Sequence, residues 1–151
     1  TMENIVIALL QRVKSASVKI DGSVTANIDE GLLVFIAFTK QDGYEQSPRL
    51  AERILNYRIF SDNKGLMNMS VIDKNFDILV VPQFTLAANT NSGNRPSFSG
   101  AAKPEVGQEL FDQFIEQLNH TNTNIKTGVF GAKMQIQLVN DGPATFWLEV
   151  K

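Results

Sequence analysis

The sequence predicts a single α/β domain in which two amphipathic helices pack against a sheet of short strands. The chain has 151 residues, the length of one ordinary domain, and 43% of them are hydrophobic, which is enough for a core. Apolar residues recur at helical spacing in two stretches, and the other apolar runs are short and bounded by turn-forming residues. We therefore expect one domain over residues 2–151.

The first quarter of the chain is predicted to be mainly sheet. Asn4–Val13 is rich in Ile, Val and Leu and is expected to form a strand. Ser17–Ile20 and Ser23–Ile28 flank Asp21-Gly22, and an Asp-Gly pair between two strand-like runs is a strong hairpin signal. Leu32–Phe38 is almost continuously apolar, which suits a central strand covered on both faces.

Two stretches predict helices. Ser47-Pro48 is expected to open the first, because serine can cap a helix and proline is favoured at its first position. Apolar residues through Leu55 then fall on one helical face. Pro104–Asn119 predicts the second helix, whose apolar residues keep the 3.6-residue period and indicate a core-facing stripe. The polar segment Thr39–Gln46 is expected to be a loop.

Between the helices the pattern favours short strands joined by turns. Tyr57–Phe60 predicts an extended segment, and Asp62–Gly65 predicts a turn. Met67–Val71 indicates another short strand. Ile78–Val81 is entirely apolar and predicts a buried strand.

The chemistry changes abruptly after that buried strand. Pro82 has no backbone donor, so it ends a sheet ladder or lies on its edge. Gln83 and Thr85 follow as uncharged hydrogen-bonding groups, with Phe84 between them. Such a strand end is either an ordinary exit into a loop or one wall of a ligand site.

The polar loop Asn89–Gly100 holds two residues that are unusual in a loop, Arg95 and Phe98. A loop that keeps both is a candidate binding loop. The alternative is that Phe98 packs beneath the loop and Arg95 is solvated.

A second polar segment, Asn140–Thr145, lies between the strand-like runs Met134–Val139 and Phe146–Val150. Its Asp-Gly-Pro composition is typical of a turn, and Gly142 can adopt backbone angles closed to other residues. The segment is therefore either a hairpin turn or a backbone device that points carbonyl oxygens at a ligand.

Composition excludes several kinds of chemistry. The chain has no cysteine and one histidine, His120, so thiolate chemistry is excluded and a metal site would need carboxylates almost alone. We expect neither a metal nor a cofactor.

A net charge of −2 argues against a dedicated DNA- or RNA-coating protein, although Arg12, Lys14 and Lys19 could form a small positive stripe. No apolar run of membrane-spanning length occurs and no secretion signal is evident, so we expect a cytoplasmic protein without membrane contact.

Few side chains could carry acid–base catalysis. A nucleophile–histidine–carboxylate triad would have to use His120, which follows an amphipathic helix, and no glycine-framed serine occurs. The acidic residues are scattered singly. An enzyme of this composition would bind and polarise its substrate with backbone groups, Gln83 and Thr85, and the substrate itself could supply a reacting group.

Over nearly its whole length the chain resembles the D-aminoacyl-tRNA deacylase family. The matching motifs are colinear and together far more specific than any one of them: Leu10-Gln11-Arg12-Val13, Ala16-Ser17-Val18, Gly31-Leu32-Leu33-Val34, Tyr57-Arg58-Ile59-Phe60-Ser61-Asp62, Met67-Asn68, Gln83-Phe84-Thr85-Leu86, Arg95-Pro96-Ser97-Phe98, Thr127-Gly128 with Phe130, and Asn140-Asp141-Gly142-Pro143 with Thr145-Phe146-Trp147.

The resemblance implies a compact α/β fold with a barrel-like core, acting as a homodimer. It implies hydrolysis of the ester between a D-amino acid and the 3′ end of tRNA, with the tRNA 2′-hydroxyl in place of a protein base. Glycine mischarged on tRNA would also be a substrate, because it has no side chain to clash.

The resemblance also implies roles for individual residues. Gln83, Phe84 and Thr85 match the catalytic motif that forms the floor of the site. Gly142 and Pro143 match a Gly-Pro pair with a cis bond that reaches across the dimer interface, holds the substrate amino group and excludes L-amino acids.

Three further positions match residues around that site. Arg12 matches the arginine that orients the Gly-Pro pair, and Phe130 and Met134 match positions near the terminal adenosine.

One position departs from the family pattern. Pro82 stands where the family has serine, and a related deacylase group that accepts L-alanyl-tRNA carries Pro-Gln at this place. That group usually has alanine where this chain has Phe84. Two alternatives therefore accompany the main interpretation, a relaxed deacylase that acts on L-alanyl-tRNA and a non-catalytic module that binds the tRNA 3′ end.

Overall fold

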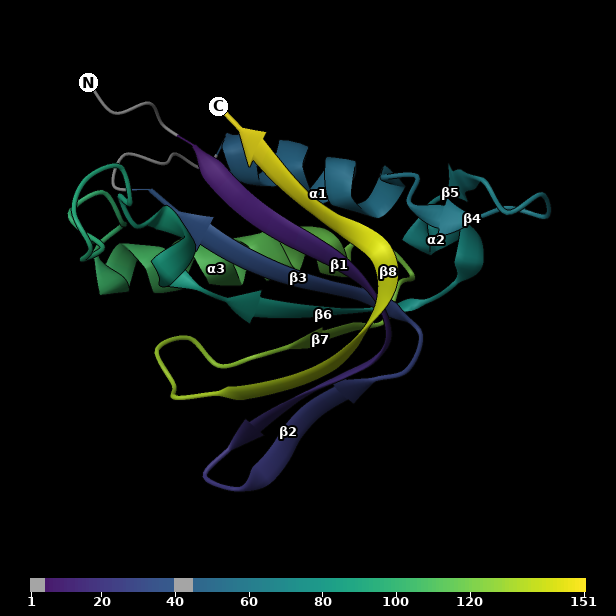
Figure 1. Ribbon diagram of the computed structural model, residues 1–151, viewed down its shortest axis with the longest axis horizontal. Helices are drawn as coiled ribbons and strands as arrows, with labels where there is room; N and C mark the ends of the chain where they lie inside the picture. Colours follow the sequence, from purple (N-terminus) through teal and green to yellow (C-terminus); the bar gives the residue numbers. More distant parts are fainter. Residues whose placement is uncertain (1–4, 40–44) are drawn as a thin grey trace.

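The computed structural model describes residues 5–39 and 45–151 (Figure 1). The strands are β1 (Val6–Ile20), β2 (Ser23–Ile28), β3 (Gly31–Phe38), β4 (Phe60–Ser61), β5 (Met67–Met69), β6 (Asp77–Pro82), β7 (Ile125–Thr127) and β8 (Gln135–Val150). The helices are α1 (Gln46–Asn56), α2 (Val71–Lys74) and α3 (Pro104–Asn119), and a 3₁₀ turn, η1 (Phe84–Ala87), follows β6.

The main sheet is mixed and has the order β2-β1-β3-β6-β7, with β8 along the other side of β1. Strand β1 pairs antiparallel with β3 through its first half and with β2 through its second, whereas β3 pairs parallel with β6 and β6 with β7. The second half of β1 and the first half of β8, which pair with each other, curl beneath the sheet, so that β2 approaches β6 and β7 (Figure 1). The predicted α/β fold with a barrel-like core is confirmed.

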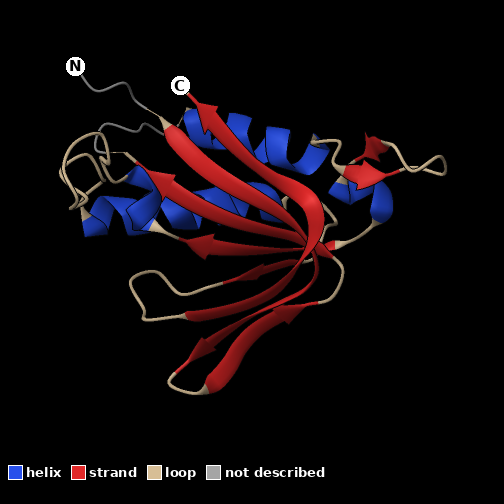
Figure 2. Cartoon of the chain, in the orientation of Figure 1, coloured by secondary structure: helices blue, strands red, loops and turns tan. Residues whose placement is uncertain are grey.

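Two hydrophobic cores lie on the two faces of this curled sheet. Successive side chains of β3 point to opposite faces, so Leu32, Val34 and Ile36 face the helices while Leu33 faces the inside of the curl. Both long helices lie on one face of the sheet (Figure 2), and their apolar stripes complete the first core. The buried residues that α1 and α3 contribute to that core are Leu50, Ala51, Ile54, Leu55, Leu110, Phe111, Phe114 and Leu118.

Several sequence predictions are confirmed at residue level. The Asp21-Gly22 hairpin joins β1 to β2, with positive φ angles of 50° and 81° at the two turn residues. The second helix has the predicted bounds, Pro104–Asn119. The turn at Asp62–Gly65 joins β4 to β5, and the Asp62 carboxylate accepts hydrogen bonds from the backbone of Lys64 and Leu66.

Other predictions need correction. Asn4–Val13 and Ser17–Ile20 are parts of one strand, because β8 pairs with β1 along most of its length, and Asn4 lies outside the described residues. Helix α1 begins at Gln46, and Ser47 is fully buried inside its first turn instead of capping it. The predicted loop Thr39–Gln46 falls largely on residues 40–44, which lie outside the described residues.

The predicted strand Met67–Val71 also ends early. The side chain of Ser70 accepts a hydrogen bond from the backbone of Asp73, and the Asp73 carboxylate accepts one from the backbone of Ser70. This reciprocal cap starts helix α2 at Val71.

The interpretation of Asn140–Thr145 as a hairpin turn is wrong. Strand β8 runs without interruption from Gln135 to Val150 and pairs with β1 on both sides of the segment. Val13 pairs with Asn140 and Gln11 with Thr145, so the residues between them form a bulge opposite Arg12. Within the described residues, no helix is long and apolar enough to cross a membrane.

Candidate active site

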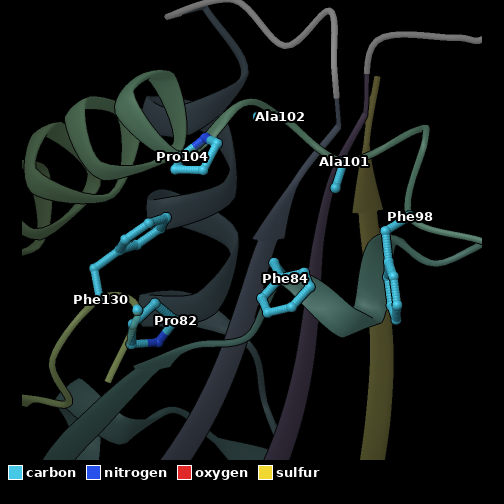
Figure 3. A pocket seen from close by; sticks show the side chains of 8 residues that line it. Pro82, Phe84, Phe98, Ala101, Ala102, Pro104 and Phe130 are labelled. Carbon is cyan, nitrogen blue, oxygen red and sulfur yellow. The ribbon is translucent and has the colours of Figure 1, made fainter. Parts of the chain in front are cut away.

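An apolar pocket of about 320 Å³ opens where β6 ends (Figure 3). Pro82, Phe84 and Phe130 face a common space below Pro104, the first residue of α3 (Figure 3). The lining is mostly apolar and comes from the end of β6, η1, the segment up to the start of α3 and the loop after β7. Its residues are Pro82, Phe84, Phe98, Ala101, Ala102, Pro104, Phe130 and Gly131.

Proline at position 82 is compatible with the sheet because of where its nitrogen points. The backbone N–H of Gln83 donates to the carbonyl of Ile36 on β3 at 2.8 Å, so the nitrogen of Pro82 faces the opposite side. On that side β7 pairs with β6 only as far as Val80. The missing donor therefore breaks no ladder hydrogen bond, and the chain leaves the sheet directly into η1.

The polar residues of this strand end are already paired with each other. Gln83 Nε2 donates to Thr85 Oγ1 at 2.6 Å. Because the Thr85 hydroxyl oxygen accepts this bond, its own proton is available to donate to a ligand. Thr85 is exposed, and Gln83 is partly buried beneath it.

Two aromatic rings are held at the mouth of the pocket. Phe84 is 56% exposed and Phe98 is 43% exposed, and the rings meet edge to face with centroids 5.4 Å apart. Phe98 therefore packs against Phe84 and not beneath its loop, and the interpretation of Asn89–Gly100 as a binding loop stays a prediction. Arg95 is exposed. Large exposed aromatic side chains beside an apolar pocket indicate a surface that a ligand covers.

Two glycines make room for the deeper pocket residues. A Cβ atom on Gly107 of α3 would lie 2.9 Å from Cζ of Phe130, so the glycine lets the ring rest against the helix. A Cβ atom on Gly128 would lie 2.8 Å from the sulfur of Met134 and 3.4 Å from Cδ of Pro82. Phe130 lines the pocket, whereas Met134 lies beside Gly128 and packs against the second core; their place near a terminal adenosine stays a prediction. The role of Gly107 was missed, because its sequence position shows only a helix interior.

The second predicted part of the site is the bulge in β8, which Arg12 holds. Arg12 is only 8% exposed. Its Nε donates to the backbone carbonyl of Asp141 at 3.1 Å and lies 3.2 Å from the Asp141 carboxylate. Its Nη1 donates to the buried carbonyl of Ile59 at 2.7 Å. One guanidinium therefore ties the bulge to the segment before β4.

Asn140 closes the bulge from the other side. Its Nδ2 donates to the carbonyls of Arg12 at 3.1 Å and Ala144 at 3.2 Å, which spans the loop of the bulge. Ala144 is buried, whereas Gly142 and Pro143 are exposed, and the bond between them is cis. The bulge thus presents a short, well-braced piece of backbone to the outside.

Within one chain these two parts of the site lie apart. Arg12 pairs with Leu32 near the start of β3, while Gln83 hydrogen-bonds to Ile36 near its end. Four residues of strand span roughly 13 Å. Figure 1 shows the bend in β8 at the opposite end of the sheet from the start of α3. The structure therefore brings together Gln83, Phe84, Thr85, Phe130 and Met134, and separately Arg12, Gly142 and Pro143.

The described part of the chain contains no cluster of side chains that could bind a metal ion. No group of three or more histidine or carboxylate side chains is close enough there to hold an ion.

Comparison with solved structures identifies the fold class of this protein. A solved structure titled as the c-Myc DNA unwinding element binding protein superimposes with a TM-score of 0.90 at 37% identity, covering 94% of this chain and 97% of that one. A probable eukaryotic D-amino acid tRNA deacylase superimposes with a TM-score of 0.82 at 19% identity, covering 96% and 99%, and supports the fold alone. The curled mixed sheet with its two helices is thus the fold of these proteins.

The sequence comparisons then establish the family. The profile of the D-Tyr-tRNA(Tyr) deacylase family matches residues 9–149. D-aminoacyl-tRNA deacylase of Janthinobacterium sp. (strain Marseille) is 50% identical, over 96% of this chain and 97% of that protein. The corresponding protein of Pseudomonas putida (strain GB-1) is 51% identical, over 94% and 98%. The chain belongs to the D-Tyr-tRNA(Tyr) deacylase family.

Proposed function

We propose that this protein hydrolyses the ester that joins a D-amino acid to the 3′ end of tRNA, and so removes D-amino acids from translation. Family membership over nearly the full chain supports this activity. The observation that carries the assignment of the site is the apolar pocket, with two aromatic side chains and the Gln83–Thr85 pair at its edge.

The pocket suits the terminal adenosine of the substrate. Phe84 and Phe130 offer apolar faces on which a base can stack, an interaction worth about 1–3 kcal/mol per base in single-stranded nucleic-acid sites. A volume of about 320 Å³ falls within the range of small-ligand pockets.

We propose that the active protein is a homodimer. Gly142 and Pro143 are exposed and braced, yet they lie at the opposite end of the sheet from the pocket of their own chain. A two-fold dimer places the same surface of each copy against the other, so the bulge of one copy can enter the pocket of its partner. Each pocket then gains the backbone carbonyls that it lacks alone.

Water cleaves the ester in this arrangement. Water adds to the carbonyl carbon, the bond from that carbon to the ribose oxygen breaks, and the ribose oxygen takes up a proton, which releases the amino acid and tRNA. The neighbouring 2′-hydroxyl of the terminal ribose relays the proton. Thr85, whose hydroxyl proton is not used by Gln83, donates a hydrogen bond that positions the substrate.

Chiral selection comes from the Gly142–Pro143 backbone. Its carbonyl oxygens accept hydrogen bonds from the substrate amino group and leave no space for the side chain of an L-amino acid. A D-side chain points away, and glycine has none, so glycyl-tRNA is also cleaved.

The test is release of labelled amino acid from D-tyrosyl-tRNA, L-tyrosyl-tRNA and L-alanyl-tRNA, measured side by side. Release from the D-form alone supports the proposal. Release from L-alanyl-tRNA as well identifies the relaxed deacylase and makes Pro82 the residue to change to serine. No release from any substrate, with retained binding, leaves the non-catalytic module.

Two variants test the site itself. Phe84→Ala removes one face of the pocket, and Gly142→Ala puts a Cβ atom 3.1 Å from Oδ1 of Asn140, whose amide braces the bulge. Both should lose turnover while keeping the fold. Gln108→Ala, which removes an exposed bond to Asp112, is the matched control and should keep full turnover.

The same proposal fixes the expected partners and location. The substrate is an aminoacyl-tRNA recognised at its 3′ end, and such substrates occur in the cytoplasm. A net charge of −2 keeps DNA outside the expected partners of this chain, although the structural neighbour at 37% identity is titled as a DNA unwinding element binding protein.

A further inference from the structure

A polar network on the small β4–β5 hairpin has no role in the reaction described above. Arg58 donates from Nε to the backbone carbonyl of Asn68 at 2.9 Å and from Nη2 to Asn68 Oδ1 at 3.0 Å. Asn68 Nδ2 in turn donates to Asp62 Oδ2 at 2.8 Å. The other carboxylate oxygen of Asp62 accepts the backbone N–H groups of Lys64 and Leu66, at 2.8 and 3.0 Å.

This network fixes the conformation of a tight turn. The backbone N–H of Ile59 donates to the carbonyl of Tyr57 at 3.1 Å, so Arg58 is the central residue of a three-residue turn. The side chain of that central residue is the one held by Asn68. Any rotation of the turn would have to break this two-point contact.

The turn connects directly to the bulge in β8. The carbonyl of Ile59 accepts the buried 2.7 Å hydrogen bond from Arg12, and the same guanidinium holds the backbone carbonyl of Asp141. On the other side of the bulge, the ring of Phe146 meets that of Tyr57 edge to face at 5.9 Å. The segment Tyr57–Ile59 therefore contacts β8 directly at Phe146, and Arg12 links it to Asp141 on the other side of Gly142 and Pro143.

We propose that the Asp62–Asn68–Arg58 network is a positioning element that sets, through Ile59 and Arg12, the orientation of the Gly142–Pro143 backbone and thereby the preference for D- over L-substrates. The inference rests on the function proposed for that backbone. Asp62 is a strong hydrogen-bond acceptor for Asn68 in this network, because hydrogen bonds from Asn68 and from the backbone of Leu66 and Lys64 hold its pKa below the usual value.

Asn68→Ala tests the proposal by removing both side-chain bonds of Asn68 while leaving its backbone carbonyl. The quantity to measure is the ratio of kcat/KM for D-tyrosyl-tRNA to that for L-tyrosyl-tRNA. A change of about 1.4 kcal/mol in relative transition-state binding is tenfold, and we expect the ratio to fall by about that factor. Release from the D-substrate should change by less than about twofold.

An exchange of the two side chains provides the rescue. In the double variant Asp62→Asn with Asn68→Asp, the amide at position 62 can still accept the backbone N–H groups and donate to position 68. The carboxylate at position 68 can still accept from Arg58. The double variant should recover the wild-type ratio, whereas Asn68→Asp alone sets two carboxylates against each other and should not.

The matched control is Asp73→Ala on the adjacent helix α2. It removes a bond of 2.9 Å from the backbone of Ser70 but leaves Arg58, Asn68 and Asp62 bonded to one another. It should keep the wild-type ratio. An equal fall in this control, or an unchanged ratio in Asn68→Ala, would overturn the proposal.

Failure of the proposed function can be told apart from failure of the positioning role. If the wild type releases no D-amino acid, the proposed function fails, and positioning is read from backbone amide exchange instead. Asn68→Ala should then speed exchange at Asp141, Gly142 and Ala144, and Asp73→Ala should not. Unchanged exchange at those amides in Asn68→Ala would overturn the positioning role on its own terms.

Discussion

Arg12→Ala is the substitution that most directly tests how the bulge is held. It leaves the buried carbonyl of Ile59 without its donor, at a cost of about 1–3 kcal/mol. The contacts to Asp141 are worth less, because its carboxylate is 36% exposed and water can replace the guanidinium; we assign them about 1 kcal/mol together. The expected loss in the free energy of unfolding is therefore about 2–4 kcal/mol.

The assay is urea unfolding together with thermal melting. For a chain of this length each kcal/mol lowers the melting temperature by about 2–4 °C, so a fall of roughly 5–15 °C is expected. Arg53→Ala removes one exposed bond of 3.3 Å to the carbonyl of Glu149 and should cost well under 1 kcal/mol by comparison. If the two arginine variants lose equal stability, Arg12 does not clamp the bulge and the reasoning fails.

Three further predictions concern the sheet, the pocket and pH. A Cβ atom on Gly31 would collide with the backbone carbonyl of Asp77, so Gly31→Ala should separate β3 from β6 and cost several-fold more stability than a surface Ala substitution in urea unfolding. Phe130→Ala should raise KM for D-aminoacyl-tRNA about tenfold or more in steady-state kinetics, because a stacking face is lost. Hydrogen bonds from Ser70 hold the pKa of Asp73 below its ordinary 3.8, so this carboxylate stabilises the fold above that pH and ceases to do so as the pH falls through its lowered pKa. Between pH 5 and pH 3, the free energy of unfolding of Asp73→Asn should accordingly fall less than that of the wild type.

The sequence pattern predicted an element correctly where the residues of that element alone determine its structure. The helix Pro104–Asn119 has a full apolar stripe and a proline at its start, and its predicted bounds are the observed ones. Asp21-Gly22 forms the hairpin because both residues can take positive φ. Ser47 is an exception. Its side chain suits a helix cap, but it is buried inside the first turn of α1, because tertiary packing there outweighs the local preference.

The sequence identified the candidate site residues, but their own sequence pattern did not predict where in the fold each of them lies. Gln83, Phe84 and Thr85 are close in sequence and remain close in the fold. Nothing local indicates that Gly142 lies at the far end of the sheet, because that depends on the pairing of β1 with both β3 and β8. The contribution of Gly107 was equally hidden, since it depends on a ring more than twenty residues away along the chain.

The bulge in β8 shows why turn composition alone cannot distinguish a hairpin from an interrupted strand. Asn-Asp-Gly-Pro satisfies the local demands of either structure. The choice is made by Arg12 and Asn140, whose hydrogen bonds join positions about 130 residues apart and are satisfied only if β8 continues along β1. A hairpin would separate the buried Arg12 guanidinium from both the carbonyl and the carboxylate of Asp141, and a buried charge that loses its ionic partner is destabilising. The same contacts leave Gly142 and Pro143 as the exposed part of the segment, so the interactions that select the fold also present the backbone that we propose selects the substrate.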